Sequence, residues 1–362
     1  MSGFWVRALV AAVLLASVPV AVSAQQPSLP RPPELTEQAI DAADFDGWRA
    51  RLDELAKAQA AESRRPKSKR KADGAPPVGK APPDPFLVRV QILLDRAHAS
   101  PGVIDGRDGG NFRKAVRAFQ EMRTLAVTGE PDAEFWAALS ADQRKATLIY
   151  ELTQADVDGP YSPPLPKDFA KLAKMKSLGY SGPEEMLAER FHLDEPLLRA
   201  LNPGVDFRKT GQKILVPDVS GEPTARVLRI VVEREGGELK AYDKDGAIVL
   251  VDPATVGSQD TPSPSGRMKV TKAYPDPPYH YDPKKNFQQG KNRRKLTLPP
   301  GPNGPVGSMW IDLTKPTYGI HGTPDPEKID KTGSHGCVRL TNWDAQALAA
   351  LVEPGKTEVE FR

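Results

Sequence analysis

Cysteine and histidine are scarce in this chain: its 362 residues include one cysteine and five histidines. A single cysteine excludes an intrachain disulfide framework and any zinc site built from several cysteines. An excess of charge of one sign is also missing, because 50 Lys and Arg residues stand against 47 Asp and Glu residues and leave a net charge of +3. Dedicated nucleic-acid binders carry a marked basic excess, so we expect no nucleic-acid partner.

Long hydrophobic runs are absent beyond the N-terminus, where Arg7 precedes an apolar run over residues 8–22. Pro19 interrupts this run, which is shorter than the roughly 20 residues that span a bilayer. It ends in Val22-Ser23-Ala24, a small-residue cleavage pattern. These features predict a secretory signal peptide over residues 1–24. We expect a mature protein outside the cytoplasm with no membrane span; an uncleaved N-terminal anchor is the alternative.

Proline, in contrast, is abundant: the 37 prolines are about twice the usual share. Residues 25–85 combine prolines with a basic run over 64–71 and are predicted to be a linker. One short amphipathic helix is expected within it, because four apolar residues recur at helical spacing. They are Phe45, Trp48, Leu52 and Leu55.

Two small modules are predicted to follow the linker. Residues 86–140 have helical periodicity, and their segments 102–106 and 115–120 resemble the three-helix peptidoglycan-binding domain of cell-wall enzymes. A generic helical spacer is the alternative. Residues 150–220 contain two helices and a strand at 214–217 and resemble the second half of a lysin-motif domain, although its usual first strand is not recognisable. This α+β region is expected either to bind glycan or only to orient the domain after it.

From residue 226 onward the pattern changes to short β-branched segments separated by turn sequences such as Glu235-Gly236-Gly237-Glu238. A single helix is expected over 343–352, opened by the capping sequence that starts at Thr341. Residues 226–362 are therefore predicted to form a mainly-β domain, a β-sandwich or a partly open barrel. The fold class of the whole chain is multidomain, with small α-helical and α+β modules ahead of this domain.

The single cysteine lies in the sequence Ser334-His335-Gly336-Cys337-Val338-Arg339. In an extended segment side chains two residues apart share a face, so His335 is expected beside Cys337. His321, at the end of an earlier predicted strand, is a second candidate neighbour. A thiol with a pKa near 8.5 is mostly protonated at neutral pH, and a neighbouring imidazole can take its proton. Gly336 lets backbone amides approach a substrate oxyanion closely.

These observations predict that Cys337 is a nucleophile, with either His321 or His335 as its base, since spacing alone does not decide between them. A buried, inert cysteine is one alternative. A zinc site of two histidines and this cysteine is a weaker one, because only Asp325 or Asp330 offers a further ligand. We expect no metal and no cofactor.

The same residues resemble the catalytic signature of the L,D-transpeptidases, which have a YkuD-type domain. The signature comprises His321-Gly322-Thr323, the segment 334–340, and Asn342 with the helix after it. The proline- and glycine-rich segments 261–266 and 301–307 fit the same pattern. The resemblance covers residues 226–361 and implies an L,D-transpeptidase fold and activity. It also implies a location in the periplasm or cell envelope, with peptidoglycan stem peptides and glycan strands as partners.

The resemblance implies a role for each matched residue. Cys337 attacks the carbonyl of the third residue of a tetrapeptide stem and expels D-alanine, and His321, oriented by Gly322, is its base. His335 and the amides of Gly336 and Cys337 stabilise the oxyanion. The implied substrate contacts are Ser334, Arg339, Thr323, Tyr318 and Asn342.

The acyl group then passes to an amine of a second stem or of a wall-anchored protein. Water as the acceptor makes the enzyme an L,D-carboxypeptidase, and a non-catalytic peptidoglycan-binding protein is the other alternative. Residues 274–305 form a long insertion with six basic residues between Lys284 and Lys295. We expect a structureless loop that resembles the family's lid and suits an anionic stem; a mobile, solvated loop is the alternative.

Overall fold

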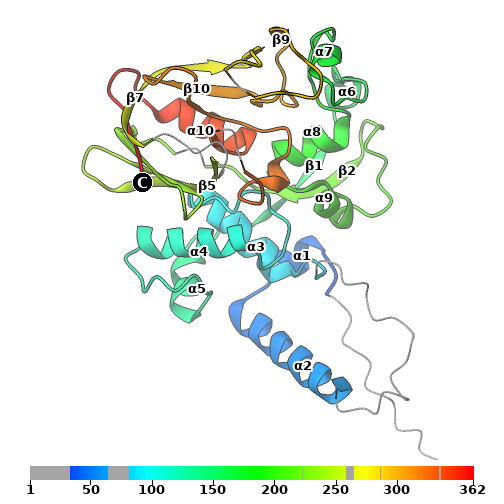
Figure 1. Ribbon diagram of the computed structural model, residues 1–362. Coiled ribbons are helices and arrows are strands. Elements are labelled where there is room, and N and C mark those ends of the chain that lie inside the picture. Colours follow the sequence, from blue (N-terminus) through cyan, green and yellow to red (C-terminus); the bar gives the residue numbers. More distant parts are fainter. Residues whose placement is uncertain (1–32, 64–80, 222, 258–264, 286, 334–335) are drawn as a thin grey trace, which may run out of the picture.

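The computed structural model describes residues 33–63, 81–221, 223–257, 265–285, 287–333 and 336–362 (Figure 1). The predicted signal peptide and its cleavage pattern, the basic run at 64–71, and the site candidates Ser334 and His335 lie outside these ranges. Among the described residues, no helix has the length and apolar character needed to cross a membrane.

The predicted linker contains two helices, α1 (Glu37–Asp41) and α2 (Phe45–Ser63), where one was expected. The start of α2 is docked on the helical module: the Trp48 ring stacks on Phe86 with centroids 5.0 Å apart. Arg51 forms an ion pair with Asp84 at 3.1 Å. Aromatic stacking of this kind adds to the burial of both rings, so this part of the linker is attached to the module after it.

The helical module has the three helices predicted from its periodicity: α3 (Pro85–Arg96), α4 (Gly110–Met122) and α5 (Ala133–Leu139). Asp84 caps α3 through the Phe86 amide, and Pro85 occupies the first turn, where no amide proton is needed. Phe119 and Phe135 meet edge to face in the core, with centroids 5.5 Å apart.

The middle region contains an antiparallel pair of strands, β1 (Thr147–Glu151) and β2 (Lys213–Pro217), in register from Thr147↔Pro217 to Glu151↔Lys213. The first strand of a lysin-motif domain is not recognisable in the sequence, but β1 is present in the structure, so the expectation that it is missing was wrong. Four helices lie between the strands: α6 (Gln154–Asp158), α7 (Phe169–Leu172), α8 (Pro183–Arg190) and α9 (Glu195–Leu201).

The C-terminal domain is built on one nine-stranded sheet with the order β5-β4-β3-β13-β7-β10-β11-β12-β6. The strands are β3 (Arg229–Glu233), β4 (Glu238–Tyr242), β5 (Ile248–Pro253), β6 (Thr255–Val256), β7 (Gly266–Pro275), β10 (Met309–Leu313), β11 (Gly319–His321), β12 (Val338–Arg339) and β13 (Glu358–Phe361). Its two edge strands, β5 and β6, are separated in the chain by Ala254 alone. The edges therefore meet, and the sheet is a nearly closed barrel. The prediction of a mainly-β domain that is partly open is confirmed.

One helix, α10 (Asn342–Leu351), contributes Leu348 and Leu351 to the core of this sheet. Its predicted capping sequence is confirmed: the Thr341 hydroxyl accepts a hydrogen bond from the Asp344 amide at 3.1 Å. The outer edge of β5 is covered by the helical module, since the Val251 amide donates to His98 at 2.9 Å and the Ser100 amide donates to Val251 at 2.8 Å.

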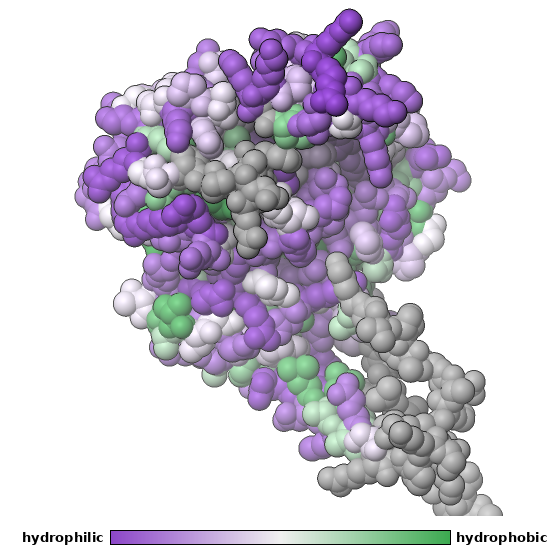
Figure 2. Space-filling view, viewed as in Figure 1, coloured by the Kyte–Doolittle hydropathy of each residue, from purple (hydrophilic) through white to green (hydrophobic). Residues whose placement is uncertain are grey.

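The insertion at 274–305 is not structureless, which corrects the prediction from sequence. It contains a hairpin of β8 (Tyr279–Tyr281) and β9 (Leu296–Leu298), paired from Tyr279↔Leu298 to Tyr281↔Leu296. Figure 1 shows this hairpin beside α7, at the opposite end of the molecule from α2. Hydrophilic side chains project from this end of the surface (Figure 2).

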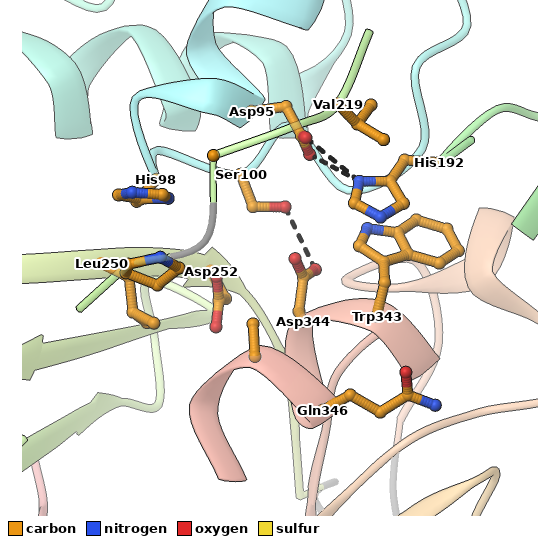
Figure 3. Close-up of a pocket in the computed structure, with 13 residues that line it drawn as sticks. Asp95, His98, Ser100, His192, Val219, Leu250, Asp252, Trp343, Asp344 and Gln346 are labelled. Carbon is orange, nitrogen blue, oxygen red and sulfur yellow. Dashed lines mark hydrogen bonds and ion pairs between the residues drawn. The ribbon is translucent and has the colours of Figure 1, made fainter. Parts of the chain in front are cut away.

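The three parts of the molecule meet around a polar cavity of about 290 Å³ (Figure 3). His192 joins them: its ring stacks on Trp343 with centroids 4.9 Å apart, and its Nδ1 lies 3.0 Å from Asp95. The Ser100 hydroxyl donates to Asp344 at 3.1 Å. Asp252 is buried beside this carboxyl, and its Oδ2 has no hydrogen-bond partner among the described residues.

The two buried carboxyls at this junction make stability depend on pH. Burial and the neighbouring carboxylates raise the pKa of Asp344 to about 6 and raise that of Asp252 as well. These two groups therefore bind more protons in the folded state than in the unfolded state above about pH 4. Their contribution to stability is greatest below that pH and declines as the pH rises through 6.

We expect Asp252→Asn to relieve this penalty by roughly 1–3 kcal/mol at pH 8, because the amide carries no charge. Its melting temperature should exceed that of the wild type by a few degrees at pH 8 and match it at pH 4.5, as measured by scanning calorimetry. Asp245→Asn, at an exposed carboxyl in the same domain, is the control. A lower melting temperature than the wild type at pH 8 would contradict the prediction.

Candidate active site

The candidate site lies where three strands of the barrel run side by side. Trp310 of β10 pairs with His321 of β11, and His321 pairs in turn with Arg339 of the parallel strand β12. Residues two apart in a strand, and residues paired across strands, point to the same face. Gly319, His321 and Arg339 therefore share one face, and Cys337 precedes β12 directly.

Cys337 lies against the start of β11. Its Sγ is 3.7 Å from the Thr317 carbonyl oxygen, and the Gly319 amide donates a hydrogen bond to its sulfur. Thr317 has a positive φ of 74°, which a β-branched residue adopts only under strain. Sequence reasoning gave no sign of this conformation.

His321 is buried and held in one orientation. Its Nδ1 lies 2.7 Å from the Gly322 carbonyl oxygen, and its ring stacks on Trp310 with centroids 5.5 Å apart. A carbonyl oxygen only accepts hydrogen bonds, so Nδ1 carries the proton and Nε2 has a lone pair to offer. Burial and the nearby charge of Arg339 lower the pKa of His321 to about 3, so the imidazole is neutral at physiological pH.

The surroundings of the cysteine also favour its neutral form. Burial raises the pKa of the Cys337 thiol, while the Gly319 amide and the positive charge of Arg339 partly offset this rise. A neighbouring imidazole was expected to take the thiol proton, whereas the surroundings of the two side chains favour a protonated thiol and a neutral imidazole. Gly336 has a φ of 102°, a conformation that side chains rarely adopt, and this accounts for glycine before the cysteine.

Gly319 and Trp310 were not identified from the sequence. A Cβ at Gly319 would lie 2.4 Å from the Trp310 ring, so the indole that stacks on His321 requires glycine here. The available signal was the glycine itself, because a glycine inside a strand commonly marks the close approach of another group.

Asn342, expected to contact substrate, is directed into the protein. Its Oδ1 accepts hydrogen bonds from the Ser308 and Thr323 amides at 3.0 and 3.1 Å. Its Nδ2 donates to Glu189 at 2.9 Å and to the Pro302 carbonyl at 3.3 Å. Four hydrogen bonds use the full capacity of an amide, so none is left for a ligand.

The other candidates are distributed around this centre. Thr323 is buried, and its hydroxyl accepts a hydrogen bond from the Asp325 amide at 3.2 Å. Tyr318 is half-buried with the Lys315 ammonium 4.8 Å from its ring centre. Arg339 is half-buried near Asp325 and Cys337, whose charges partly offset the lowering of its pKa by burial.

The hairpin of the insertion approaches the same centre. Tyr279 is half-buried, and burial is the main cause that raises its pKa to about 12, with smaller contributions from the neighbouring Cys337 and Tyr281 when these are ionised. The zinc alternative gains no ligands here, because Asp325 pairs with Lys328 and Asp330 pairs with Lys114. The described part of the chain holds no group of three or more His, Cys, Asp and Glu residues arranged for a metal.

Comparisons with known proteins fit this geometry. A family described as "L,D-transpeptidase catalytic domain" matches residues 228–360, and a "Putative peptidoglycan binding domain" matches residues 84–139. The "Putative L,D-transpeptidase YkuD" of Bacillus licheniformis is 32% identical over 173 residues, which span 47% of this chain and 88% of that protein. The "Probable L,D-transpeptidase YbiS" of Escherichia coli is 29% identical over 55% of this chain and 67% of its own length.

Solved structures of L,D-transpeptidases are similar to a smaller part of the molecule. The enzyme of Enterococcus faecium is 24% identical with a TM-score of 0.29, covering 40% of this chain and 56% of that chain. TM-scores of this size are too low to establish a common fold, so the family of this chain is established by the domain match and the sequence relatives. On that basis the chain belongs to the L,D-transpeptidase family, with its catalytic domain over residues 228–360 and a peptidoglycan-binding domain over residues 84–139.

Proposed function

We propose that this protein acylates Cys337 with the tetrapeptide stem of peptidoglycan, releases D-alanine, and transfers the acyl group to an amine in the cell envelope. The observation that carries the proposal is the position of the chain's single cysteine, Cys337, against strand β11 of the domain that matches the family. On that strand a buried, neutral His321 has its Nδ1 proton directed to Gly322.

The first half-reaction begins with a thiol. As Sγ attacks the carbonyl carbon of the third stem residue, the thiol proton passes to Nε2 of His321. The oxyanion is stabilised by the amides of Gly336 and Cys337 and by His335. Collapse of the tetrahedral intermediate breaks the peptide bond, and the imidazolium returns its proton to the departing amine of D-alanine. A thioester remains on Cys337.

In the second half-reaction an amine attacks the thioester and loses its proton to His321, and the sulfur leaves as the restored thiol. A second stem gives a cross-link, and a wall-anchored protein gives a protein–wall bond. Water in place of the amine gives a carboxypeptidase. The helical module at 84–139 and the β1–β2 region are proposed to hold glycan strands near the site, with residues 1–24 as the export signal.

The charge of the substrate matters for the proton transfer. The Arg339 guanidinium lowers the pKa of His321, which opposes formation of the imidazolium. A stem carboxylate bound against Arg339 would neutralise this effect and make the imidazole more basic. In this proposal Arg339 binds the stem and also couples stem binding to the activation of Cys337. Tyr318 and Thr323 contact the stem, and Asn342 positions the backbone at Ser308 and Thr323.

The central test uses the full-length protein with a disaccharide-tetrapeptide. The wild type should release D-alanine and show an acyl adduct on Cys337 by mass spectrometry. Cys337→Ala should do neither, because no nucleophile remains. His321→Gln should lose a factor of about 10²–10⁴ in the rate of D-alanine release.

Two controls complete this test. Asp245→Asn, at an exposed residue in the turn between β4 and β5, should keep the wild-type rate. A folded wild-type protein that neither releases D-alanine nor forms an adduct with any amine acceptor would rule out the proposal. Release of tripeptide alone, even with excess acceptor, would identify water as the acceptor.

The pH dependence of thiol alkylation distinguishes a neutral pair from an ion pair. Because burial raises the pKa of the Cys337 thiol, its reaction with iodoacetamide should accelerate continuously from pH 6 to at least pH 9. A thiolate–imidazolium pair would react at a constant rate between about pH 5 and pH 8. A plateau in that range would show that the resting site is ionised.

Gly319→Ala tests the support of His321 by Trp310. The added Cβ displaces the indole, so kcat/KM for D-alanine release should fall at least about tenfold, as a misplaced catalytic base commonly causes. Gly110→Ala is the matched control, since a Cβ at Gly110 meets open space. If Gly319→Ala keeps the wild-type kcat/KM and a native circular dichroism spectrum, the Trp310 contact does not position the base.

A further inference from the structure

The hairpin β8–β9 packs against residues 165–178 of the middle region. We propose that residues 165–178, here named the clamp, hold this hairpin in place next to Cys337, and that Phe169 is the positioning residue through which they do so. The clamp would thereby set the access of a stem peptide to the cysteine. This inference rests on the proposed function for the identity of the substrate, but its main test does not.

The clamp and the hairpin share a small hydrophobic core of their own. Leu172 and Leu178 from the clamp and Tyr281 and Leu298 from the hairpin are all buried, and they form a cluster separate from the barrel core. An isolated two-stranded hairpin is at best marginally stable in water. With strands of only three residues, this hairpin depends on the clamp to cover its apolar face.

Phe169 is the centre of this contact. Its ring meets those of Tyr279, Tyr281 and Phe287 edge to face, with centroids 6.0, 5.3 and 6.0 Å apart. Edge-to-face aromatic pairs add to the stabilisation that burial of the rings gives, so one side chain holds three positions of the hairpin.

Hydrogen bonds join the two segments on both sides of the ring cluster. The Phe169 amide donates to Gln289 Oε1 at 3.2 Å, and Gln289 Nε2 donates to the Lys167 carbonyl at 2.8 Å. At the other end, the Leu178 amide donates to Pro300 and the Asn303 amide donates to Leu178, both at 2.9 Å. A Cβ at Gly301 would lie 2.2 Å from the Leu178 carbonyl oxygen, so this contact admits only glycine.

The hairpin begins and ends at the catalytic strands. Tyr274 of β7 pairs with Trp310 of β10, which pairs with His321, and the Asp276 amide donates to the Ser308 carbonyl at 2.8 Å. Tyr279 follows three residues after Asp276, and Cys337 contributes to the raised pKa of its hydroxyl, so the two side chains lie within electrostatic range of each other. A displacement of the hairpin therefore moves Tyr279 relative to Cys337 while the barrel stays intact.

The clamp is tested by measuring how fast iodoacetamide alkylates Cys337 at pH 8 in the full-length protein. Removing the ring in Phe169→Ala should release the hairpin and raise the alkylation rate at least about threefold. Gln289→Ala removes the two side-chain hydrogen bonds from the hairpin side and should raise the rate in the same direction. Phe169→Leu, which keeps an apolar side chain in the cluster, should restore most of the protection.

Lys174→Ala is the matched control, because Lys174 is an exposed clamp residue and should keep the wild-type rate. With the tetrapeptide substrate, Phe169→Ala should raise KM more than it lowers kcat, since the barrel and its catalytic pair are untouched. Alkylation rates equal to wild type in both Phe169→Ala and Gln289→Ala would overturn the proposal. If Phe169→Ala does not fold, Gln289→Ala alone decides the outcome.

The two proposals fail in different ways. If the wild-type protein does not turn over the tetrapeptide, the proposed function is wrong. Faster alkylation of Cys337 in the variants would still support the clamp in that case. If the wild type turns over the tetrapeptide but the variants are alkylated at the wild-type rate, the proposed function stands and the clamp proposal is wrong.

Discussion

The side-chain amide of Asn342 makes four hydrogen bonds on which the arrangement of the site depends. It fixes the chain directly after β11 through the Thr323 amide, and the chain before β10 through the Ser308 amide. Both approaches are possible because Gly322 and Gly307 leave room for its oxygen, which a Cβ would meet at 2.2 and 2.1 Å. Through Glu189 the same amide reaches the middle region, so the strand that carries His321 is positioned by both parts of the molecule.

Burial favours the uncharged state of both Cys337 and His321, whereas the Arg339 guanidinium favours a neutral imidazole but opposes a neutral thiol. Burial raises the pKa of Cys337 and lowers that of His321, and Arg339 shifts both values downward. The thiol is then mostly protonated near neutral pH, which lowers its reactivity, because the thiolate is the nucleophilic form.

Much of this molecule could be predicted from local patterns. The three helices of the first module, most strands of the barrel and the capping of α10 follow from periodicity and turn chemistry, and the motif around Cys337 led to the family. The features that escaped prediction depend on tertiary contacts. Strand β1 is short and its Ile149 is 51% exposed, so its apolar pattern is weak. The β8–β9 hairpin packs against α7, more than a hundred residues earlier in the chain, and the inward direction of Asn342 depends on partners from three separate segments.

The covered edge of β5 has a consequence beyond the site. Exposed edge strands are templates for pairing with other chains, and a barrel that closes through a single residue between β5 and β6 still leaves one side of β5 to be protected. On that side the Val251 amide donates to the His98 carbonyl, and the Ser100 amide donates to the Val251 carbonyl. The helical module therefore covers an edge of the sheet that a catalytic domain cut free at residue 226 would leave open for pairing with another chain.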